Sequence, residues 1–446
     1  MQKENIDISV IIPTYNRAER LHDVLQAWNA VDKVTSCSYE LIFSDDGSED
    51  DTVSILQSCK ELPIKVIANK HGGASSARNN AIKHAIGNRI IFAGDDIYPA
   101  NDFIQKHYDI GQEYGDNVAI LGLVDWHPDQ NRNYLLDHIT EVGNEQFSFN
   151  RLKDNAFTDF RHFYTCNVSV SNKMLGSVET KFDERFYKVN FEDTELSYRL
   201  FNNGMKIVYR PDIFGYHYHE YKVDKFCVRQ STAGEMAVVF QKLHPEVDSM
   251  LGISKACNIY LAYKKSENVD QGLISVPKIE SVLGVCEAFE DELKNNMDET
   301  YGSVIKRMLS LVYEKLFKLK FVEGVLITKF PDDTELVKNY LLSNYFDAEF
   351  KRVLLAEYIQ YAIKNQSNLG LLSSGALKRS RIKNDRHEKI KEIMKTIYED
   401  DQDYKISKTG LWLIAKSRFV AHLKKYYLLR QLKYKYDWVR RHLHIS

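Results

Sequence analysis

The distribution of hydrophobic and polar residues divides the N-terminal part of the chain into alternating strand and helix patterns. Short apolar runs that are typical of buried strands occupy residues 7–12, 39–44, 63–70 and 89–94. Between these runs, apolar residues recur at the spacing of an amphipathic helix. This succession predicts a parallel sheet with right-handed crossovers, and it places the ligand-binding loops at the carboxyl edge of the strands.

The pattern changes twice further along the chain. From about residue 100 to 220, helical patterns mix with short strands. We expect this stretch to form the acceptor-binding side of a ligand-binding site. Beyond about residue 225, strand signals fade and amphipathic helical patterns take over. We therefore expect an α/β domain over residues 1–250 and an α-helical C-terminal domain over residues 251–446.

Length and composition support two domains and disfavour several classes of protein. The 446 residues exceed the size at which a single core usually stops growing. A formal net charge of -2 favours neither a nucleic-acid coat protein nor an acidic tail. The six cysteines form no CxxC pair and no apolar leader precedes the first strand, so reduced cytosolic thiols are expected. No apolar stretch approaches the roughly 20 residues of a membrane-spanning helix.

Polar loops follow the first two predicted strands. Pro13, Thr14 and Tyr15 follow the first strand, where they either form a simple capped loop or face the base and ribose of a nucleotide. Asp45 and Asp46 follow the second strand. They either form an Asx turn or a helix cap, or one of them accepts the imide N–H of uracil. Both interpretations stay open at this point.

A glycine turn precedes the third predicted helix, in the segment GGASSARN at residues 72–79. The N–H groups at the start of this helix and the guanidinium of Arg78 would together receive a diphosphate. In the alternative interpretation, Ser75 or Ser76 only caps the helix.

Asp95 and Asp96 follow the fourth predicted strand and give the strongest local signal. Two adjacent carboxylates at the end of a buried strand repel each other unless a cation neutralises them. The alternative is a solvated turn. In the functional interpretation the pair holds Mn²⁺ or Mg²⁺, which acts as a Lewis acid for the departing nucleotide.

The segment FEDTELSYRL at residues 191–200 is predicted to open a helix with Glu192 and Asp193 in its first turn. Acidic residues are common there because they interact favourably with the helix dipole. In the functional interpretation, one carboxylate removes the proton from an acceptor hydroxyl. We assign this base to Asp193, with Glu192 as the second choice.

His217 and His219 alternate along a predicted strand, so we expect them to face opposite sides of it. A histidine here either forms a structural hydrogen bond or reaches the site. Of the two, His217 is assigned as a metal ligand or phosphate contact.

The order of these motifs resembles that of family 2 glycosyltransferases with the GT-A fold, over residues 6–225. The resemblance implies a Rossmann-like α/β fold whose mostly parallel sheet is flanked by helices. It also implies that the segment 13–15 and either Asp45 or Asp46 contact the nucleoside, and that Arg78 lies on the phosphate side.

The same resemblance assigns Asp95 and Asp96 to the acidic metal motif, and the Glu192–Asp193 helix start to the catalytic base of inverting members. One departure is present, because the chain reads Ala-Gly-Asp-Asp at 93–96 where many relatives have Asp-x-Asp-Asp. Asp95 is therefore assigned both to the nucleotide and to the metal, and Asp96 to the metal.

The activity implied by the resemblance is inverting transfer of a sugar from a nucleotide-sugar, most often a UDP-sugar. The acceptor would be a hydroxyl of a glycan or lipid-linked glycan, and the enzyme a hexosyl- or N-acetylhexosaminyltransferase of capsule or lipopolysaccharide synthesis. A nucleotidyltransferase is the rival enzyme, but it would need a Gly-rich motif with a Lys near the first strand. The intact carboxylates count against a catalytically silent scaffold.

The last part of the chain, residues 405–446, is rich in Lys, Arg and aromatic residues. Its helical pattern predicts one apolar face, formed by Leu429, Leu432, Tyr436, Val439 and Leu443. Such a helix would adsorb to anionic lipid. The alternatives are a basic helix packed on a bundle and, less favoured, an RNA-binding segment. We expect a cytoplasmic protein, peripheral on the inner face of the cytoplasmic membrane and without a nucleic-acid partner, and we leave oligomerisation open.

Overall fold

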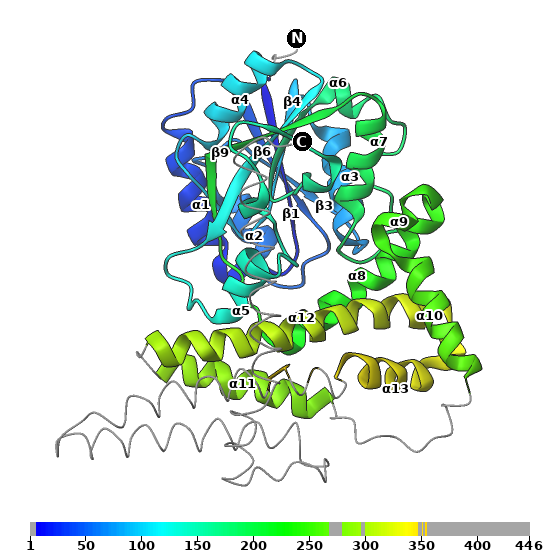
Figure 1. Cartoon of the computed structure of the whole chain (residues 1–446). Coiled ribbons are helices and arrows are strands. Elements are labelled where there is room, and N and C mark those ends of the chain that lie inside the picture. Colours follow the sequence, from blue (N-terminus) through cyan, green and yellow to red (C-terminus); the bar gives the residue numbers. More distant parts are fainter. Residues whose placement is uncertain (1–5, 267–278, 296–298, 347–349, 351–352, 355–446) are drawn as a thin grey trace, which may run out of the picture. The chain divides into compact units, whose positions relative to one another are not determined.

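The computed structural model describes residues 6–266, 279–295, 299–346, 350 and 353–354 (Figure 1). The chain divides into two compact units, of which the first combines Met1–Gly272 with Cys286–Phe346 and the second combines Leu273–Val285 with Asp347–Ser446. The predicted basic tail, residues 405–446, lies outside the described residues. The account below therefore concerns the first unit.

A nine-stranded sheet forms the centre of this unit, with the strand order β3-β2-β1-β4-β8-β6-β9-β5 and with β7 paired to β9. The strands are β1 (Ile8–Thr14), β2 (Tyr39–Asp45), β3 (Ile64–Ala68), β4 (Arg89–Ala93), β5 (Ile97–Pro99), β6 (Val118–Trp126), β7 (Phe157–Thr158), β8 (Asn167–Ser171) and β9 (Lys206–His217).

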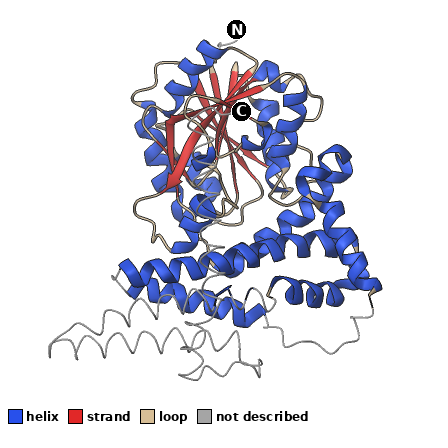
Figure 2. Ribbon diagram, in the orientation of Figure 1, coloured by secondary structure: helices blue, strands red, loops and turns tan. Residues whose placement is uncertain are grey.

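Helices cover both faces of the sheet (Figure 2). Around the sheet lie α1 (Ala18–Asp32), α2 (Thr52–Ser58), α3 (Gly73–His84), α4 (Phe103–Tyr114), α5 (Tyr134–Asp137), α6 (Asn172–Leu175) and α7 (Glu192–Asn202). The later helices are α8 (Val223–Leu243), α9 (Asp248–Leu251), α10 (Ile253–Lys265), α11 (Ile279–Asn295), α12 (Glu299–Lys329) and α13 (Thr334–Tyr345).

Most strands of the sheet run in one direction. β1 pairs in parallel with β2 and β4, and β2 pairs in parallel with β3. β8 is antiparallel to both β4 and β6, so that β6 and its parallel neighbour β9 point the same way as β1. The predicted α/β class, with a mostly parallel sheet flanked by helices and a helical C-terminal region, is confirmed.

The buried strands separate two apolar cores because side chains alternate between the faces of a sheet. In β1, Ile8, Val10 and Ile12 pack on the side of α1 and α4. Ile11 points to the opposite core, which contains residues of α3, α6 and α7. Both faces of β1 are apolar, and this explains why its sequence is a continuous hydrophobic run.

Two glycines let helices α8 and α12 approach each other closely. A Cβ atom at Gly324 would overlap the carbonyl oxygen of Ser231, and one at Gly234 would overlap that of Phe321. Helix α12 therefore packs directly on the backbone of α8, within the same compact unit as the sheet. The expected domain boundary near residue 250 stays a prediction.

Gly324→Ala is expected to destabilise this unit by about 1–3 kcal/mol, because the added methyl group must push two helix backbones apart. The measurement is the shift of the urea unfolding midpoint. Gly302→Ala, in the same helix, is the matched control, since the nearest atom to its new Cβ would be Leu293 Cδ2 at 3.8 Å. That control should be neutral or stabilise by up to about 1 kcal/mol. Equal losses in both variants would contradict the close crossing.

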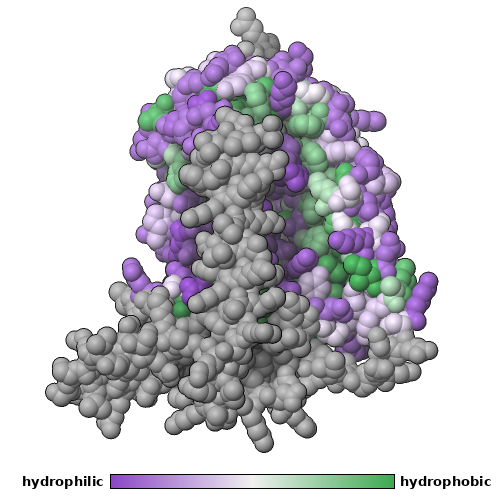
Figure 3. Space-filling view, viewed as in Figure 1, coloured by the Kyte–Doolittle hydropathy of each residue, from purple (hydrophilic) through white to green (hydrophobic). Residues whose placement is uncertain are grey.

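The surface of the described residues is mostly hydrophilic in the view of Figure 3, with a hydrophobic area at the lower right, over the region of α10. Ile259 and Leu261 of α10 are among the exposed apolar residues. Among the described residues, every helix is either too short or too polar to span a lipid bilayer.

Candidate active site

The predicted motifs meet at one edge of the sheet. β1 and β2 end side by side, with Thr14 paired to Asp45 in parallel register. β4 lies on the other side of β1, and the loop that follows it contains Asp95 and Asp96. The carboxyl ends of parallel strands share an edge, which is where open α/β sheets bind their ligands.

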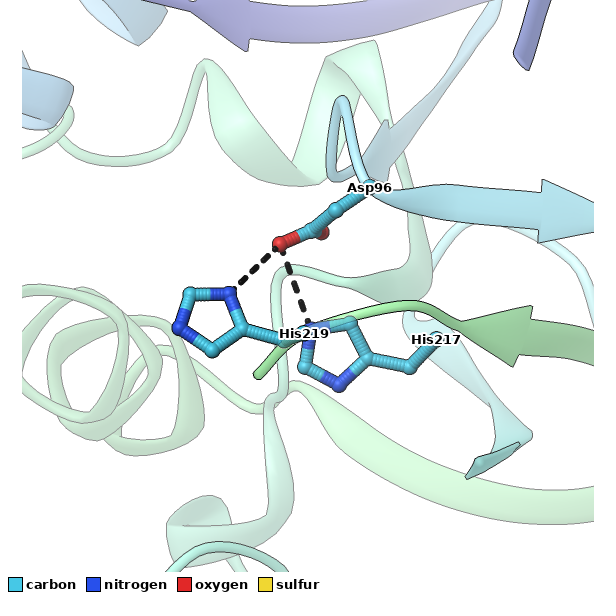
Figure 4. Close-up of side chains that lie close together, drawn as sticks. All are labelled: Asp96, His217 and His219. Carbon is cyan, nitrogen blue, oxygen red and sulfur yellow. Dashed lines mark hydrogen bonds and ion pairs between the residues drawn. The ribbon is translucent and has the colours of Figure 1, made fainter. Parts of the chain in front are cut away.

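Asp96, His217 and His219 form a group of three side chains that could hold a metal ion, the one such group among the described residues. Oδ2 of Asp96 lies 3.3 Å from Nε2 of His217 and 3.3 Å from Nδ1 of His219 (Figure 4). The three ligand atoms all lie within 4.8 Å of one another. One carboxylate and two imidazoles are a set of donors that divalent transition metals accept. These residues therefore fit a cation.

The prediction that His217 and His219 face opposite sides is wrong. Strand β9 ends at His217, so the alternation of a strand no longer applies two residues later. Both imidazoles turn toward Asp96, and Trp126 stacks on His217 at a ring-centroid distance of 5.3 Å. Of these two candidates the sequence favoured His217 as a ligand, because it gave no sign that the strand ends before His219.

Arg17 joins the two aspartates and was not assigned a role from the sequence. Its Nε lies 3.1 Å from Oδ1 of Asp95, and its Nη2 lies 3.5 Å from Oδ2 of Asp96. Asp95 is thus paired with a guanidinium and is not among the ligand atoms grouped around Asp96. The assignment of Asp95 to the metal and to the nucleotide stays a prediction.

The two aspartates differ in the direction of their pKa shifts. Burial raises the pKa of Asp95 to about 6, Arg17 opposes this rise, and the charge of Asp96 adds to it. Burial also works against ionisation of Asp96, but His217, His219 and Arg17 hold its pKa well below the usual range. Both carboxylates are therefore mostly ionised at neutral pH, and Asp96 stays ionised at lower pH than Asp95.

The two acidic residues at the start of α7 have different environments. Glu192 is buried, and its Oε1 lies 3.1 Å from Nη1 of Arg78 while its Oε2 accepts a hydrogen bond from the backbone N–H of Asn190 at 2.8 Å. Asp193 is only partly buried, and its Oδ1 accepts a hydrogen bond from the backbone N–H of Thr194 at 2.7 Å. Glu192 is thus committed to structural contacts on both oxygens.

Asp193 has the pKa that a general base needs. Burial raises its pKa to about 6, the neighbouring Glu192 carboxylate adds to the rise, and Arg78 opposes it. A base with a pKa just below the working pH is ionised and still basic enough to accept a proton. These contacts support the choice of Asp193 over Glu192, although the catalytic role itself stays a prediction.

Cys166 connects the group around Asp96 with Asp193. Burial raises the pKa of its thiol, and the charges of both Asp96 and Asp193 add to the rise while Arg78 opposes it. A charge acts on a buried group only from nearby. The carboxylates of Asp96 and Asp193 therefore both lie near the Cys166 side chain.

Asp45 has the contacts of the Asx-turn interpretation. Its Oδ2 accepts hydrogen bonds from the backbone N–H groups of Gly47 at 3.1 Å and Ser48 at 3.0 Å. These bonds hold the loop after β2 in place. Contact of Asp45 with a nucleoside stays a prediction.

Asp46 caps helix α3 from another loop. It accepts hydrogen bonds from the backbone N–H groups of Gly72 at 2.9 Å and Gly73 at 3.0 Å. The alternative in which Ser75 or Ser76 caps this helix is wrong, because both lie inside α3 and its N-terminus has no side-chain cap of its own. The donors expected for a diphosphate are thus satisfied by a carboxylate, and diphosphate binding there stays a prediction.

The loop after β1 presents one aromatic ring to solvent. Pro13 is half-buried, Thr14 is buried, and Tyr15 is 43% exposed with its ring 4.9 Å from that of His71. A partly exposed ring is suited to stacking on a base. The structure thus brings Tyr15 next to the Asp46 loop, since His71 Nδ1 lies 2.9 Å from Oδ2 of Asp46.

The sequence of this chain is similar to that of known glycosyltransferases. Residues 9–175 match the model of Glycosyl transferase family 2. The chain is 29% identical to the uncharacterized glycosyltransferase YfnE of Bacillus subtilis, over 47% of this chain and 64% of that protein. It is 26% identical to a chondroitin synthase of Pasteurella multocida, over 67% of this chain and 35% of that protein.

A shorter match has higher identity. The chain is 38% identical to the UDP-Glc:alpha-D-GlcNAc-diphosphoundecaprenol beta-1,3-glucosyltransferase WfgD of Escherichia coli, over 21% of this chain and 37% of that protein. The matched regions thus span less than two thirds of the length of each of these three relatives. The family match over residues 9–175 and the fold agree with the resemblance seen in the motifs.

Proposed function

We propose that this protein is an inverting glycosyltransferase that moves a sugar from a nucleotide-sugar to a hydroxyl of a glycan or lipid-linked glycan in surface polysaccharide synthesis. The observation that carries the proposal is the group of Asp96, His217 and His219 at the carboxyl edge of the sheet, with Asp193, a carboxylate with a raised pKa, near the same Cys166 side chain. The names of two relatives, a chondroitin synthase and a UDP-glucose-dependent glucosyltransferase, support a UDP-sugar donor and a glycan acceptor.

The chemistry requires one base and a stabilised leaving group. Asp193 would accept the proton of the acceptor hydroxyl as its oxygen forms the bond to the anomeric carbon. The bond from this carbon to the nucleotide diphosphate breaks on the opposite face, so the configuration inverts. When bound, a divalent cation would supply Lewis-acid stabilisation of the leaving diphosphate.

The residues that would hold the cation are Asp96, His217 and His219. Mg²⁺ prefers oxygen ligands, and imidazole nitrogen is more typical of transition metals. Two nitrogen donors beside one carboxylate therefore favour Mn²⁺ over Mg²⁺ in this protein. Arg17 must give up its contact with Asp96 Oδ2, or share that carboxylate, when the metal enters.

The direct test is incubation of the purified protein with Mn²⁺ and a panel of nucleotide-sugars while free nucleotide is measured. Release from at least one donor is expected, and release should increase when an acceptor glycan is added. A protein that releases nucleotide from none of the donors, with or without acceptor, would be a scaffold rather than an enzyme.

Transfer activity is expected to rise with pH through about 6. The pKa of Asp193 is about 6, so the carboxylate is mostly protonated at pH 5 and mostly ionised at pH 7. Since only the ionised form accepts a proton, kcat should increase about 10-fold between these two pH values. The measurement is kcat at saturating Mn²⁺ and donor. A rate independent of pH over this range would argue against Asp193 as the base.

We further propose a cytoplasmic protein with peripheral attachment to the inner face of the membrane through residues 405–446, the basic tail outside the described residues. Removal of these residues should reduce sedimentation with vesicles that contain anionic lipid at low salt. Vesicles of neutral lipid are the control. Equal sedimentation of the full-length and shortened proteins with anionic vesicles would contradict the attachment.

A further inference from the structure

A small cavity lies next to the group around Asp96. Its volume is about 140 Å³, and it opens between the ends of β6 and β9 and the segment at residues 140–150. Its wall includes His217, whose Nε2 contacts Asp96. The cavity is lined by Leu123, Val124, Asp125, Trp126, Thr140, Glu141, Phe147, Phe149, Asn150 and His217.

The lining combines aromatic rings with a polar rim. Trp126, Phe147 and Phe149 supply the rings. The polar rim consists of three exposed residues, Asp125, Glu141 and Asn150. A sugar ring presents C–H groups on its faces and hydroxyl groups at its edge. Aromatic walls with a few hydrogen-bonding groups at the mouth match both. An acyl lipid chain would instead need an apolar mouth.

The size of the cavity limits the ligand to one ring. A protein cavity of about 150 Å³ holds a benzene molecule, which is a six-membered ring. The volume of about 140 Å³ therefore suits a single pyranose ring or its N-acyl group. His217 is 6% exposed, and its buried Nδ1 has no hydrogen-bond partner among the described residues, so a ligand hydroxyl that reached this nitrogen would satisfy it.

The cavity borders the cation position, but neither Asp96 nor Asp193 is among the residues that line it. In the proposed reaction, the anomeric carbon of the donor is bonded to the diphosphate at the cation and must be reached by the hydroxyl that Asp193 deprotonates. His217 belongs to both places, because its Nε2 contacts Asp96 and its side chain also lines the cavity, so we infer that the cavity takes a sugar unit other than the transferred one.

The cavity also has a connection to the base. Phe147 and Phe149 pack against Tyr164 at centroid distances of 5.1 and 5.3 Å, and the charge of Asp193 acts on the Tyr164 phenol. A sugar in the cavity would therefore lie near the proposed base, Asp193, and would be a second sugar unit rather than the one that is transferred.

We propose that this cavity binds one pyranose unit of the acceptor glycan and so aligns the reacting hydroxyl with Asp193. The inference rests on the proposed function, since it identifies the acceptor side of that reaction. Its ligand class is a neutral or N-acylated hexose unit that neighbours the one that is glycosylated.

The test is direct binding of simple sugars to the full chain. Methyl β-glycosides of glucose, galactose, N-acetylglucosamine and N-acetylgalactosamine are added in the presence of Mn²⁺ and UDP, and saturation-transfer NMR measures contact with the protein. At least one glycoside should bind saturably. Asn150→Trp, an exposed change at the mouth, should weaken that binding at least 10-fold, and so should Glu141→Trp at a second rim position.

Asn117→Trp is the matched control, because Asn117 is exposed and precedes β6 at the opposite end of that strand. It should bind the glycoside like the unmodified protein. Binding of none of the glycosides, or unchanged binding in both rim variants, would overturn the proposal.

Nucleotide release from the donor panel separates this inference from the proposed function. Nucleotide release without glycoside binding would refute the cavity and retain the enzyme. Glycoside binding that both rim variants weaken, without nucleotide release from any donor, would retain the cavity as a sugar site and refute the enzyme.

Discussion

Asp193→Asn is expected to lower kcat by about 10²–10⁴-fold while donor binding is retained. The substitution keeps the size and the N–H···O contact to Thr194, but it removes the group that accepts the acceptor proton. Steady-state kinetics with saturating Mn²⁺ would measure kcat, and calorimetry with UDP would measure nucleotide affinity.

The folding stability of this variant separates a catalytic from a structural role. The pKa of Asp193 is raised in the folded state, so its ionised form opposes folding at neutral pH and a neutral Asn should leave the melting temperature unchanged or higher. Glu192→Gln is the matched comparison. It breaks the ion pair with Arg78 and should lower the melting temperature. Full activity in Asp193→Asn would remove Asp193 from the mechanism.

Asp96→Asn is expected to abolish specific Mn²⁺ binding and to lower kcat by about 10²–10³-fold. Asp96 contributes the only carboxylate of the metal-ligating group among the described residues. Loss of Lewis-acid assistance removes several kcal/mol of transition-state stabilisation, and each 1.36 kcal/mol is about a factor of ten in rate. Electron paramagnetic resonance of free Mn²⁺ would measure binding independently of activity.

Two further variants serve as comparisons. His219→Ala removes one nitrogen donor and should weaken Mn²⁺ binding by at least about 10-fold without abolishing it. Asp125→Asn changes an exposed carboxylate outside the metal-ligating group and should leave Mn²⁺ affinity unchanged. Unaltered Mn²⁺ affinity in Asp96→Asn would show that the cation binds elsewhere.

The parallel sheet and the succession of its first strands and helices along the chain could be predicted from the sequence because each signal is local. A continuous apolar run such as the one in β1 marks a strand that is buried on both faces, and helices with one apolar side follow in order. The convergence of Asp45 and Asp95 at one edge then follows from parallel pairing. The antiparallel insertion of β8 between β4 and β6 has no such local signal.

The contacts within the site could not be predicted because they join distant segments. His219 reaches Asp96 only because the chain leaves the strand after His217. Arg17 reaches both aspartates from the loop after β1, although its motif gave no hint of that partner. Asp46 similarly caps a helix that begins after the next strand. In each case the partner is fixed by tertiary packing, on which local propensity carries no information.

The close backbone contact between α8 and α12 determines how far this protein can be shortened. Ala237 and Val238 of α8 share one apolar cluster with Val325 of α12. A fragment that stops near residue 250 would expose these apolar side chains and the backbone around Gly234, which α12 covers in the full chain. Such a fragment should aggregate on expression, whereas a fragment that continues through α13 keeps these apolar side chains covered by α12. The catalytic machinery is therefore best isolated together with these later helices.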